Sequence, residues 1–363
     1  MSTKCFPINT CTQDSFRFGL EIEYLLVDAN SFRPLWHPDL QFETLNATLE
    51  AIPADDFQCD SFKVEPPHRK PGPYTVEGYH LPDPQMNPID LLPKGVEIRT
   101  PVCSSIEECL GAFKALHGRL QRGLSDAGFQ AVALSFHPTE IDFSGPQNKR
   151  RYDYWQWAMA AMLTYGPDIN ISLPEALTRR IDARDLNEKV NYYVPALVAL
   201  TLSSPLRGGK LWRIRGRFGK SVRTYHRSVV APALEIHPDE RFRLELKPFE
   251  MTRSLVDYRN YFLLWLALLL DEGLKGRASD ETRIYDLGRI ARDGVEAETV
   301  RDRATTVMDR APQALSPWGF DCASLDSFRR RLAQRHLPAD DIVSIFEREK
   351  TISGTLRHLS NLV

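Results

Sequence analysis

Residues 17–27 read RFGLEIEYLLV, and apolar and polar side chains alternate through the first eight of these residues. A period of two is typical of a β-strand with one buried face and one face toward solvent or a cavity. Alternation places Glu21 and Glu23 on one face and Leu20, Ile22 and Tyr24 on the other. The predicted strand therefore projects two carboxylates into one space.

Four further stretches of the chain show the same alternation. We predict strands over residues 95–102, 129–136, 168–173 and 241–249. Three of these strands carry polar side chains together on one face, namely Glu97 with Arg99, Asp168 with Asn170, and Arg243 with Glu245 and Lys247. Their opposite faces are apolar, so a shared core would leave the polar faces around one common cavity.

Helical patterns, with apolar residues at spacings of three and four, lie between and after the strands. We predict helices over residues 105–128, 149–164, 185–202, 254–274, 298–310, 325–335 and 340–350. The pattern favours an α+β fold in which a mainly antiparallel sheet has helices packed on one face.

Two stretches look like long loops. Residues 66–93 contain many prolines, which cannot occupy a continuous helix or a central strand, and residues 207–227 are rich in Gly, Arg and Lys. We expect a single catalytic domain over residues 1–363, with a sheet-and-helix core at 16–275 and a helical C-terminal extension at 276–363.

Composition limits the classes of function. The 363 residues include 46 Lys plus Arg and 48 Asp plus Glu, so a formal net charge of −2 provides no overall attraction for nucleic acid or an anionic membrane. The most apolar run, residues 261–270, is too short to cross a bilayer. The six cysteines form no CxxC pair, and residues 1–15 lack the pattern of a secretory signal peptide. We expect a cytoplasmic protein with small-molecule partners, and a homo-oligomer is compatible with the sequence.

The charged strand faces have two interpretations at this point. Carboxylates in excess suit a hard cation such as Mg²⁺, which substrate phosphates complete, and nearby cations would stabilise a transferred phosphoryl group. The alternative is a solvent-facing sheet whose opposite charges pair across neighbouring strands. Recurrence of the pattern in well-separated strands favours the cavity.

Four motifs resemble, in their order along the chain, those of the bacterial and plant-type glutamate–cysteine ligases and related carboxylate–amine ligases. They are Gly19-Leu20-Glu21-Ile22-Glu23, Val96-Glu97-Ile98-Arg99-Thr100-Pro101-Val102-Cys103, Ser135-Phe136-His137-Pro138 and Arg243-Leu244-Glu245-Leu246-Lys247. The resemblance extends from about Phe16 to about Gly273. It implies a catalytic domain like that of glutamine synthetase, with a curved, mainly antiparallel sheet forming a funnel and helices packed on its outer face.

The resemblance also implies an activity. ATP would phosphorylate the γ-carboxylate of glutamate or a similar acid, and an amino acid or amine would then displace phosphate to leave an amide. It implies two or more Mg²⁺ ions, with metal-binding roles for Glu21, Glu23, Glu97 and Glu245. Glu23, Arg99 and Lys247 are then the catalytic candidates, Arg99 and Lys247 by contacting phosphate or substrate carboxylates. A phosphotransferase of the same superfamily and a catalytically silent binding homologue are the alternatives.

The candidates for nucleotide or substrate binding are Arg99, His137, Asp168, Asn170, Arg215, Arg243 and Lys247. Asp168 and Asn170 stand where many relatives carry a His-x-His-x-Gly strand, and Lys247 stands where many carry arginine, whose bidentate fork a lysine cannot reproduce. Arg215 belongs to the basic stretch 207–227, which fits either a lid over ATP phosphates or a solvated loop. Nucleic-acid binding is disfavoured because no recognised motif accompanies that stretch.

Overall fold

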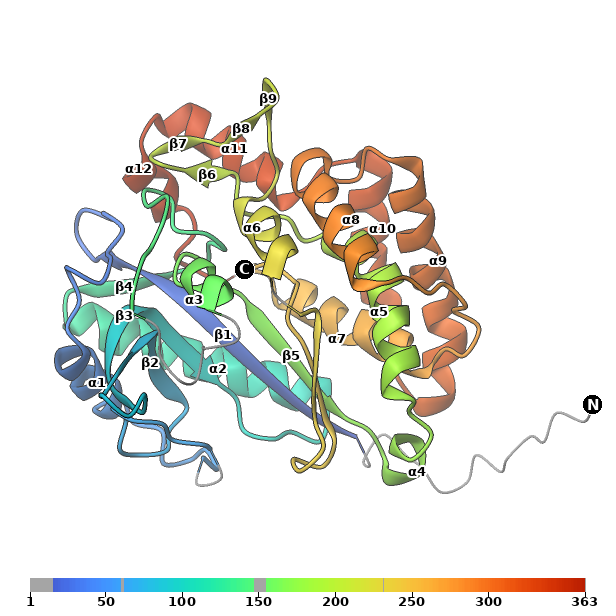
Figure 1. The fold of residues 1–363 in the computed structure, drawn as a ribbon, viewed down its shortest axis with the longest axis horizontal. Coiled ribbons are helices and arrows are strands. Elements are labelled where there is room, and N and C mark those ends of the chain that lie inside the picture. Colours follow the sequence, from blue (N-terminus) through green and yellow to red (C-terminus); the bar gives the residue numbers. More distant parts are fainter. Residues whose placement is uncertain (1–15, 60–61, 147–154, 231, 363) are drawn as a thin grey trace, which may run out of the picture.

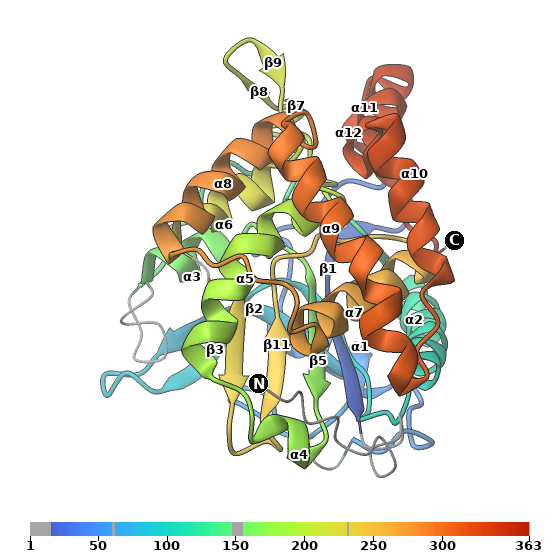
Figure 2. The same ribbon diagram turned by 90° about the vertical axis from the view of Figure 1, so that its right-hand side faces the viewer.

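A curved antiparallel sheet of seven strands forms the centre of the computed structural model, which describes residues 16–59, 62–146, 155–230 and 232–362 (Figures 1 and 2). The strand order is β10-β11-β5-β1-β3-β2, and β4 pairs with β1 beside this path. All of these pairings are antiparallel. The strands are β1 (Arg17–Asp28), β2 (Tyr74–Pro82), β3 (Pro88–Arg99), β4 (Phe129–Val132), β5 (Pro167–Ser172), β10 (Leu234–His237) and β11 (Arg243–Leu246).

Most of the helices cover one face of this sheet or stack behind that layer, whereas α3 lies over the opposite face (Figures 1 and 2). They are α1 (Phe42–Glu50), α2 (Ile106–Asp126), α3 (Trp155–Ala161), α4 (Glu175–Thr178), α5 (Ala183–Val198), α6 (Val222–Val230), α7 (Leu255–Leu270), α8 (Asp280–Asp293), α9 (Glu298–Leu315), α10 (Asp326–Gln334), α11 (Pro338–Glu349) and α12 (Ile352–Arg357). The predicted α+β fold, an antiparallel sheet with helices on its outer face, is confirmed.

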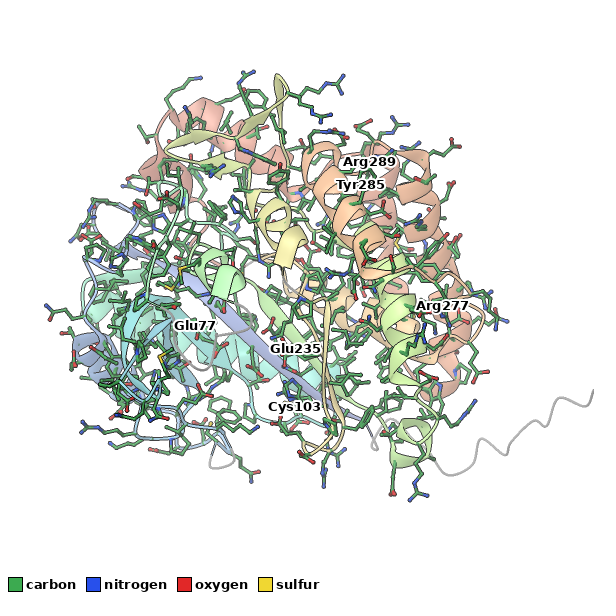
Figure 3. The ribbon with its side chains drawn as sticks, in the orientation of Figure 1. Glu77, Cys103, Glu235, Arg277, Tyr285 and Arg289 are labelled. Carbon is green, nitrogen blue, oxygen red and sulfur yellow. The ribbon has the colours of Figure 1, made fainter. Side chains whose placement is uncertain are left out.

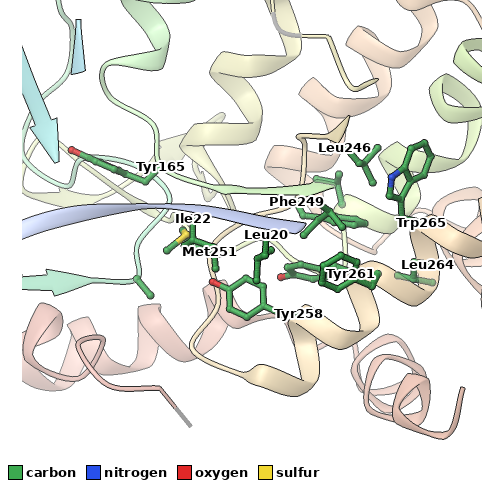
Figure 4. Close-up of a cluster of buried hydrophobic side chains, with 14 of the residues drawn as sticks. Leu20, Ile22, Tyr165, Leu246, Phe249, Met251, Tyr258, Tyr261, Leu264 and Trp265 are labelled. Atoms are coloured by element: carbon green, nitrogen blue, oxygen red, sulfur yellow. The ribbon is translucent and has the colours of Figure 1, made fainter. Parts of the chain in front are cut away.

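The apolar faces of the strands meet helix α7 in the core (Figure 4). Leu20 and Ile22 of β1 and Leu246 of β11 are fully buried, as are Tyr261 and Trp265 of α7. Burying one such large side chain contributes about 1.5–3 kcal/mol relative to leaving it in water. Because residues 261–270 of α7 are apolar on every side of the helix, α7 packs against the sheet on one side and against α9 on the other. This packing leaves the polar faces of the strands pointing away from α7.

The stretch 66–93 is not a loop, contrary to our prediction. It contains strand β2 and the beginning of strand β3, which form an antiparallel hairpin. Strand β2 lies at the edge of the sheet, where prolines are tolerated, and Pro82 and Pro88 stand at strand ends. The proline content therefore excluded neither strand: β2 lies at the edge, and residues 88–93 belong to the central strand β3, where they pair only with β2.

The stretch 207–227 is also more ordered than the predicted loop. It contains two short hairpins, β6 (Leu206–Arg207) with β7 (Lys210–Leu211) and β8 (Arg213–Ile214) with β9 (Arg217–Phe218), and the beginning of α6. Figures 1 and 2 show the β8–β9 hairpin projecting from one end of the molecule. Residues 149–154, the first part of the helix predicted over 149–164, lie outside the described residues. In the described part of the chain, no helix is both long and apolar enough to cross a membrane.

Candidate active site

Strand register brings the charged faces of the sheet together. Glu21 of β1 lies opposite Arg99 of β3 on one side and Asp168 of β5 on the other, and Glu23 lies opposite Glu97. Further along the sheet, Asn170 of β5 lies opposite Glu245 of β11. These pairings follow from backbone hydrogen bonding alone, so they place the polar side chains in one contiguous area.

This area forms the wall of a cavity of about 880 Å³. Nine of the predicted site residues line it: Glu21, Glu23, Glu97, Arg99, Asp168, Asn170, Arg243, Glu245 and Lys247. Glu77 and Glu235, labelled in Figure 3, come from strands β2 and β10 at the two edges of the sheet and line the same cavity. The cavity therefore spans the whole width of the sheet.

Three carboxylates gather at the β2–β3 end of the cavity. One oxygen from each of Glu23, Glu77 and Glu97 lies within 4.8 Å of the other two, and we call this group the three-carboxylate cluster. Burial, followed by the negative charges of Glu21 and Glu77, raises the pKa of Glu97 well above the ordinary glutamate range. Carboxylate oxygens that converge, and whose negative charge is not neutralised, are typical ligands of a hard divalent cation such as Mg²⁺.

Lys94 provides the ion-pair partner of this cluster within the described residues. Lys94 is 3% exposed, and its ammonium group donates hydrogen bonds to Glu23 Oε2 (2.9 Å) and to the carbonyl oxygens of Ala161 (3.1 Å) and Thr164 (2.9 Å). These three acceptors use all three ammonium donors. Lys94 therefore holds Glu23 in one orientation and ties it to the segment after α3.

A β-bulge turns Lys94 toward the cavity. Glu77 pairs with Gly95 while Gly78 pairs with Pro93, so Lys94 is an extra residue in strand β3. The bulge brings backbones close together: a Cβ atom on Gly78 would lie 2.0 Å from Leu92 O, and one on Gly95 would lie 2.0 Å from Tyr24 O. Glycine is thus required at both positions for this geometry.

A different arrangement occupies the β5–β11 part of the cavity. The guanidinium NH1 of Arg243 donates to Asn170 Oδ1 (2.6 Å) and Glu245 Oε2 (2.6 Å) and lies 3.9 Å from Glu21 Oε1. Asn170 Nδ2 in turn donates to Glu21 Oε1 (3.1 Å). We call Glu21, Asn170, Arg243 and Glu245 the arginine cluster.

Lys247 adds a second cation beside this cluster. Its Nζ atom donates to Asp168 Oδ2 (3.0 Å) and to Glu245 Oε1, and His237 Nε2 contacts Glu245 Oε2 (2.9 Å). Burial acts to raise the pKa of Glu245, but the hydrogen bond from His237 and the charge of Lys247 outweigh it and lower that pKa. Glu245 is therefore held as an ionised carboxylate, in contrast to Glu97.

Arg99 lines the cavity and donates two hydrogen bonds to the backbone. Its NH1 and NH2 groups donate to the carbonyl oxygens of Lys63 (3.0 Å) and Gly72 (3.0 Å), and its guanidinium lies 5.0 Å from the ring centroid of Phe62. Arg99 thus fastens the segment after residue 61 to the cavity wall.

Two predicted site residues do not line this cavity. His137 is fully buried, where its Nε2 contacts Leu35 O (3.2 Å) and its Nδ1 accepts from Glu140 N (3.1 Å). Burial lowers the pKa of this imidazole to about 4. Arg215 lies at the exposed turn of the β8–β9 hairpin, with a positive φ of 49°.

Sequence reasoning missed many residues of the cavity wall, and five polar ones among them are Thr75, Glu77, Lys94, Glu235 and His237. A signal existed for four of them, because the apolar residues 74 and 76, and 234 and 236, alternate with these polar ones. The runs were passed over since the first lies among prolines and the second is only four residues long. Lys94 has no such signal, since alternation assigns it to the core face.

Comparison with known proteins identifies the family of this chain. Residues 17–229 match the model of glutamate–cysteine ligase family 2 (GCS2). This chain belongs to that family. The match covers strands β1 to β9, and therefore includes the three-carboxylate cluster but not Arg243, Glu245 or Lys247.

GCS2 relatives align with part of the chain. A protein of Jannaschia sp., provisionally named glutamate–cysteine ligase 2, is 26% identical over 207 residues, which are 55% of this chain and 44% of that protein. A protein of Rhodospirillum rubrum with the same provisional name is 28% identical over 203 residues, 54% of this chain and 44% of that protein. The match thus spans less than half the length of each curated relative.

Solved structures share the fold over nearly the whole chain. The bifunctional glutathione synthetase of Pasteurella multocida has a TM-score of 0.63 at 14% identity, covering 96% of this chain and 52% of that one. The glutamate–cysteine ligase of Francisella tularensis, solved in complex with AMP, has a TM-score of 0.62 at 10% identity, covering 96% and 89%. At these identities the likeness establishes the fold of this GCS2 member.

Proposed function

We propose that this GCS2 member is an ATP- and Mg²⁺-dependent ligase that activates the γ-carboxylate of glutamate, or of a similar acid, as an acyl phosphate and joins it to an amine. One observation carries the proposal: the three-carboxylate cluster and the partly buried cations Arg243 and Lys247 line a single cavity. Family membership and the AMP bound to the Francisella relative support the use of a nucleotide.

Each half of the cavity suits one part of this chemistry. Glu23, Glu77 and Glu97 would hold Mg²⁺, which when bound would withdraw negative charge from phosphoryl oxygens. Arg243 and Lys247 are positioned to stabilise charge on the transferred phosphoryl group. Arg99 and Asp168 remain candidates for contacting the substrate carboxylate and amine.

The bonds in the proposed reaction balance in two steps. A carboxylate oxygen of the acid attacks the γ-phosphorus of ATP, which breaks the bond to the β-phosphate oxygen and releases ADP. The amine nitrogen then attacks the acyl carbon and loses a proton, and inorganic phosphate leaves with the bonding electron pair. Amide, ADP and phosphate are the products.

ADP release tests the proposal. Purified protein with Mg-ATP and L-glutamate is scanned against cysteine, other amino acids, simple amines and polyamines, and products are examined by mass spectrometry. Acceptor-dependent ADP release with a new γ-glutamyl mass is expected, and Glu23→Gln should abolish it. Because this variant also breaks the ion pair with the buried Lys94, its folding is checked separately by circular dichroism. A phosphorylated product without an amide would instead indicate a phosphotransferase. Silence across a panel of acids and amines would indicate a binding homologue.

A further inference from the structure

The two acidic groups of the cavity differ in how much of their charge the protein already neutralises. The three-carboxylate cluster has three carboxylates and, within the described residues, one ion-pair partner, Lys94. When all three carboxylates are ionised, as metal binding requires, three negative charges and one positive charge leave a surplus of two. One divalent cation matches that surplus, and the carboxylate oxygens of the cluster already lie within 4.8 Å of one another.

The arginine cluster, in contrast, already contains a cation at its centre. Arg243 NH1 lies among one oxygen each of Glu21, Asn170 and Glu245, at 3.9, 2.6 and 2.6 Å. Three oxygens from three different strands converge on one nitrogen, and this is the kind of position that a metal ion would take.

The cation is held from its other side as well. Arg243 Nε donates to Glu240 Oε2 over 2.8 Å, so the planar guanidinium is fixed at both ends. A metal ion would have to displace a group that makes charge-assisted hydrogen bonds to Asn170, Glu245 and Glu240.

The carboxylate oxygens around the arginine are also in use. Glu245 Oε1 accepts from Lys247, and Glu245 Oε2 accepts from Arg243 and contacts His237 Nε2 at 2.9 Å. Glu235, His237 and Glu245 could together offer three ligand atoms, but Lys247 Nζ lies 3.7 Å from Glu235 Oε2 and contacts Glu245. A second ion would therefore meet a fixed ammonium as well as a fixed guanidinium.

We propose that Arg243 takes the place of a second metal ion, and that this chain by itself binds one divalent cation, at Glu23, Glu77 and Glu97. The role of the ion in this inference rests on the proposed function. The number of Mg²⁺ ions bound per chain, expected from the resemblance to be two or more, is reduced to one. The number of bound ions can be counted without any turnover.

Manganese titration provides that count. The full chain, free of nucleotide, is titrated with Mn²⁺, and free Mn²⁺ is followed by electron paramagnetic resonance, with calorimetry as a second readout. We expect one ion per wild-type chain and at least tenfold weaker binding in Glu97→Gln. Arg243→Gln should bind a second ion, because it exposes oxygens of Glu21, Asn170 and Glu245. Arg243→Lys, the matched control, retains the positive charge and should still bind one.

Several results would overturn the proposal. They are two ions, or none, in the wild-type chain, and a single ion in a folded Arg243→Gln variant. Circular dichroism checks folding, and Arg243→Ala, which leaves open space at the same position, replaces Arg243→Gln if that variant does not fold. A chain that binds one ion but forms no amide would contradict the proposed function alone. A working ligase that binds two ions would contradict this inference alone.

Discussion

Lys94 Nζ donates a hydrogen bond to Glu23 Oε2 over 2.9 Å, although strand alternation assigns the two side chains to opposite faces of the sheet. The bulge between Glu77 and Gly78 of β2 and residues 93–95 of β3 reverses the direction of the lysine. The contact joins a buried ammonium to one carboxylate of the three-carboxylate cluster. It makes Lys94 a structural support of the candidate metal site.

Replacing Lys94 tests this support. We expect Lys94→Met to lower the free energy of unfolding by about 2–3 kcal/mol, because Glu23 and the carbonyls of Ala161 and Thr164 lose their buried donor. Urea denaturation measures the change. In the control Lys70→Met, an exposed pair with Glu50 is lost, and the change should stay below about 1 kcal/mol. Equal changes in the two variants would show that the buried pair contributes no more to the free energy of unfolding than the exposed pair does.

Glu97→Gln should separate activity from stability. Neutralising a carboxylate that repels Glu21 and Glu77 should leave the metal-free free energy of unfolding unchanged or up to about 1 kcal/mol higher. Turnover should fall at least about 10²-fold, because the divalent ion loses a charged ligand. The measurements are chemical denaturation in a chelator and the ADP-release assay. Glu272→Gln, on an exposed side chain, is the control, and a Glu97→Gln chain that loses more than about 2 kcal/mol would contradict the repulsion.

The raised pKa of Glu97 predicts a pH dependence of stability. The folded chain keeps this proton to a higher pH than the unfolded chain, whose glutamates titrate near 4.5, so the contribution of Glu97 to stability falls as pH rises from 4.5 through its raised pKa. In chelator, the Tm of Glu97→Gln minus that of the wild type should therefore grow with pH and then level off. Saturating Mn²⁺ should favour the wild type instead, since the metal binds the deprotonated carboxylate. A difference in Tm that shrinks as pH rises would contradict the assignment.

His137 should matter for stability rather than for turnover. Its folded pKa of about 4 lies below the ordinary value of 6.5, so its contribution to stability is present above pH 6.5 and is lost as pH falls toward 4. We expect His137→Gln to lower the free energy of unfolding at pH 7 by about 1–3 kcal/mol, because buried contacts to Leu35 and Glu140 are lost, and to flatten this pH dependence. Thermal unfolding between pH 4 and 8 and the ADP-release assay are the measurements. If His137→Gln lost turnover but kept the stability of the wild type, His137 would have a direct role in the reaction.

Much of the candidate site could be predicted from alternation. Glu21, Glu97, Asp168 and Glu245 were assigned to one face of their strands because a period of two is a local property of extended backbone, and the structure brings them to one cavity wall. The roles assigned to these residues stay predictions until the metal count and the ADP assay are made.

The residues that were missed depend on strand pairing. Glu77 lies in a proline-rich stretch that becomes a strand only because β3 supplies its hydrogen-bonding partner. Glu235 and His237 lie in a strand of four residues, too short for a reliable period, which is ordered by pairing with β11. Local sequence contributes little free energy to the formation of such short strands, so pairing with the neighbouring strands of the sheet determines whether they form.

The sequence by itself determined the α+β class, the apolar helix over residues 255–270 and the strand faces that carry the carboxylates. Each of these follows from the spacing of side chains along a single element. Only the tertiary structure decided that Lys94 turns into the cavity, that Arg243 lies between Glu21 and Glu245, and that His137 and Arg215 lie away from the cavity wall. A bulge and a buried ion pair depend on the register of neighbouring strands, and that register is set by packing across the whole sheet.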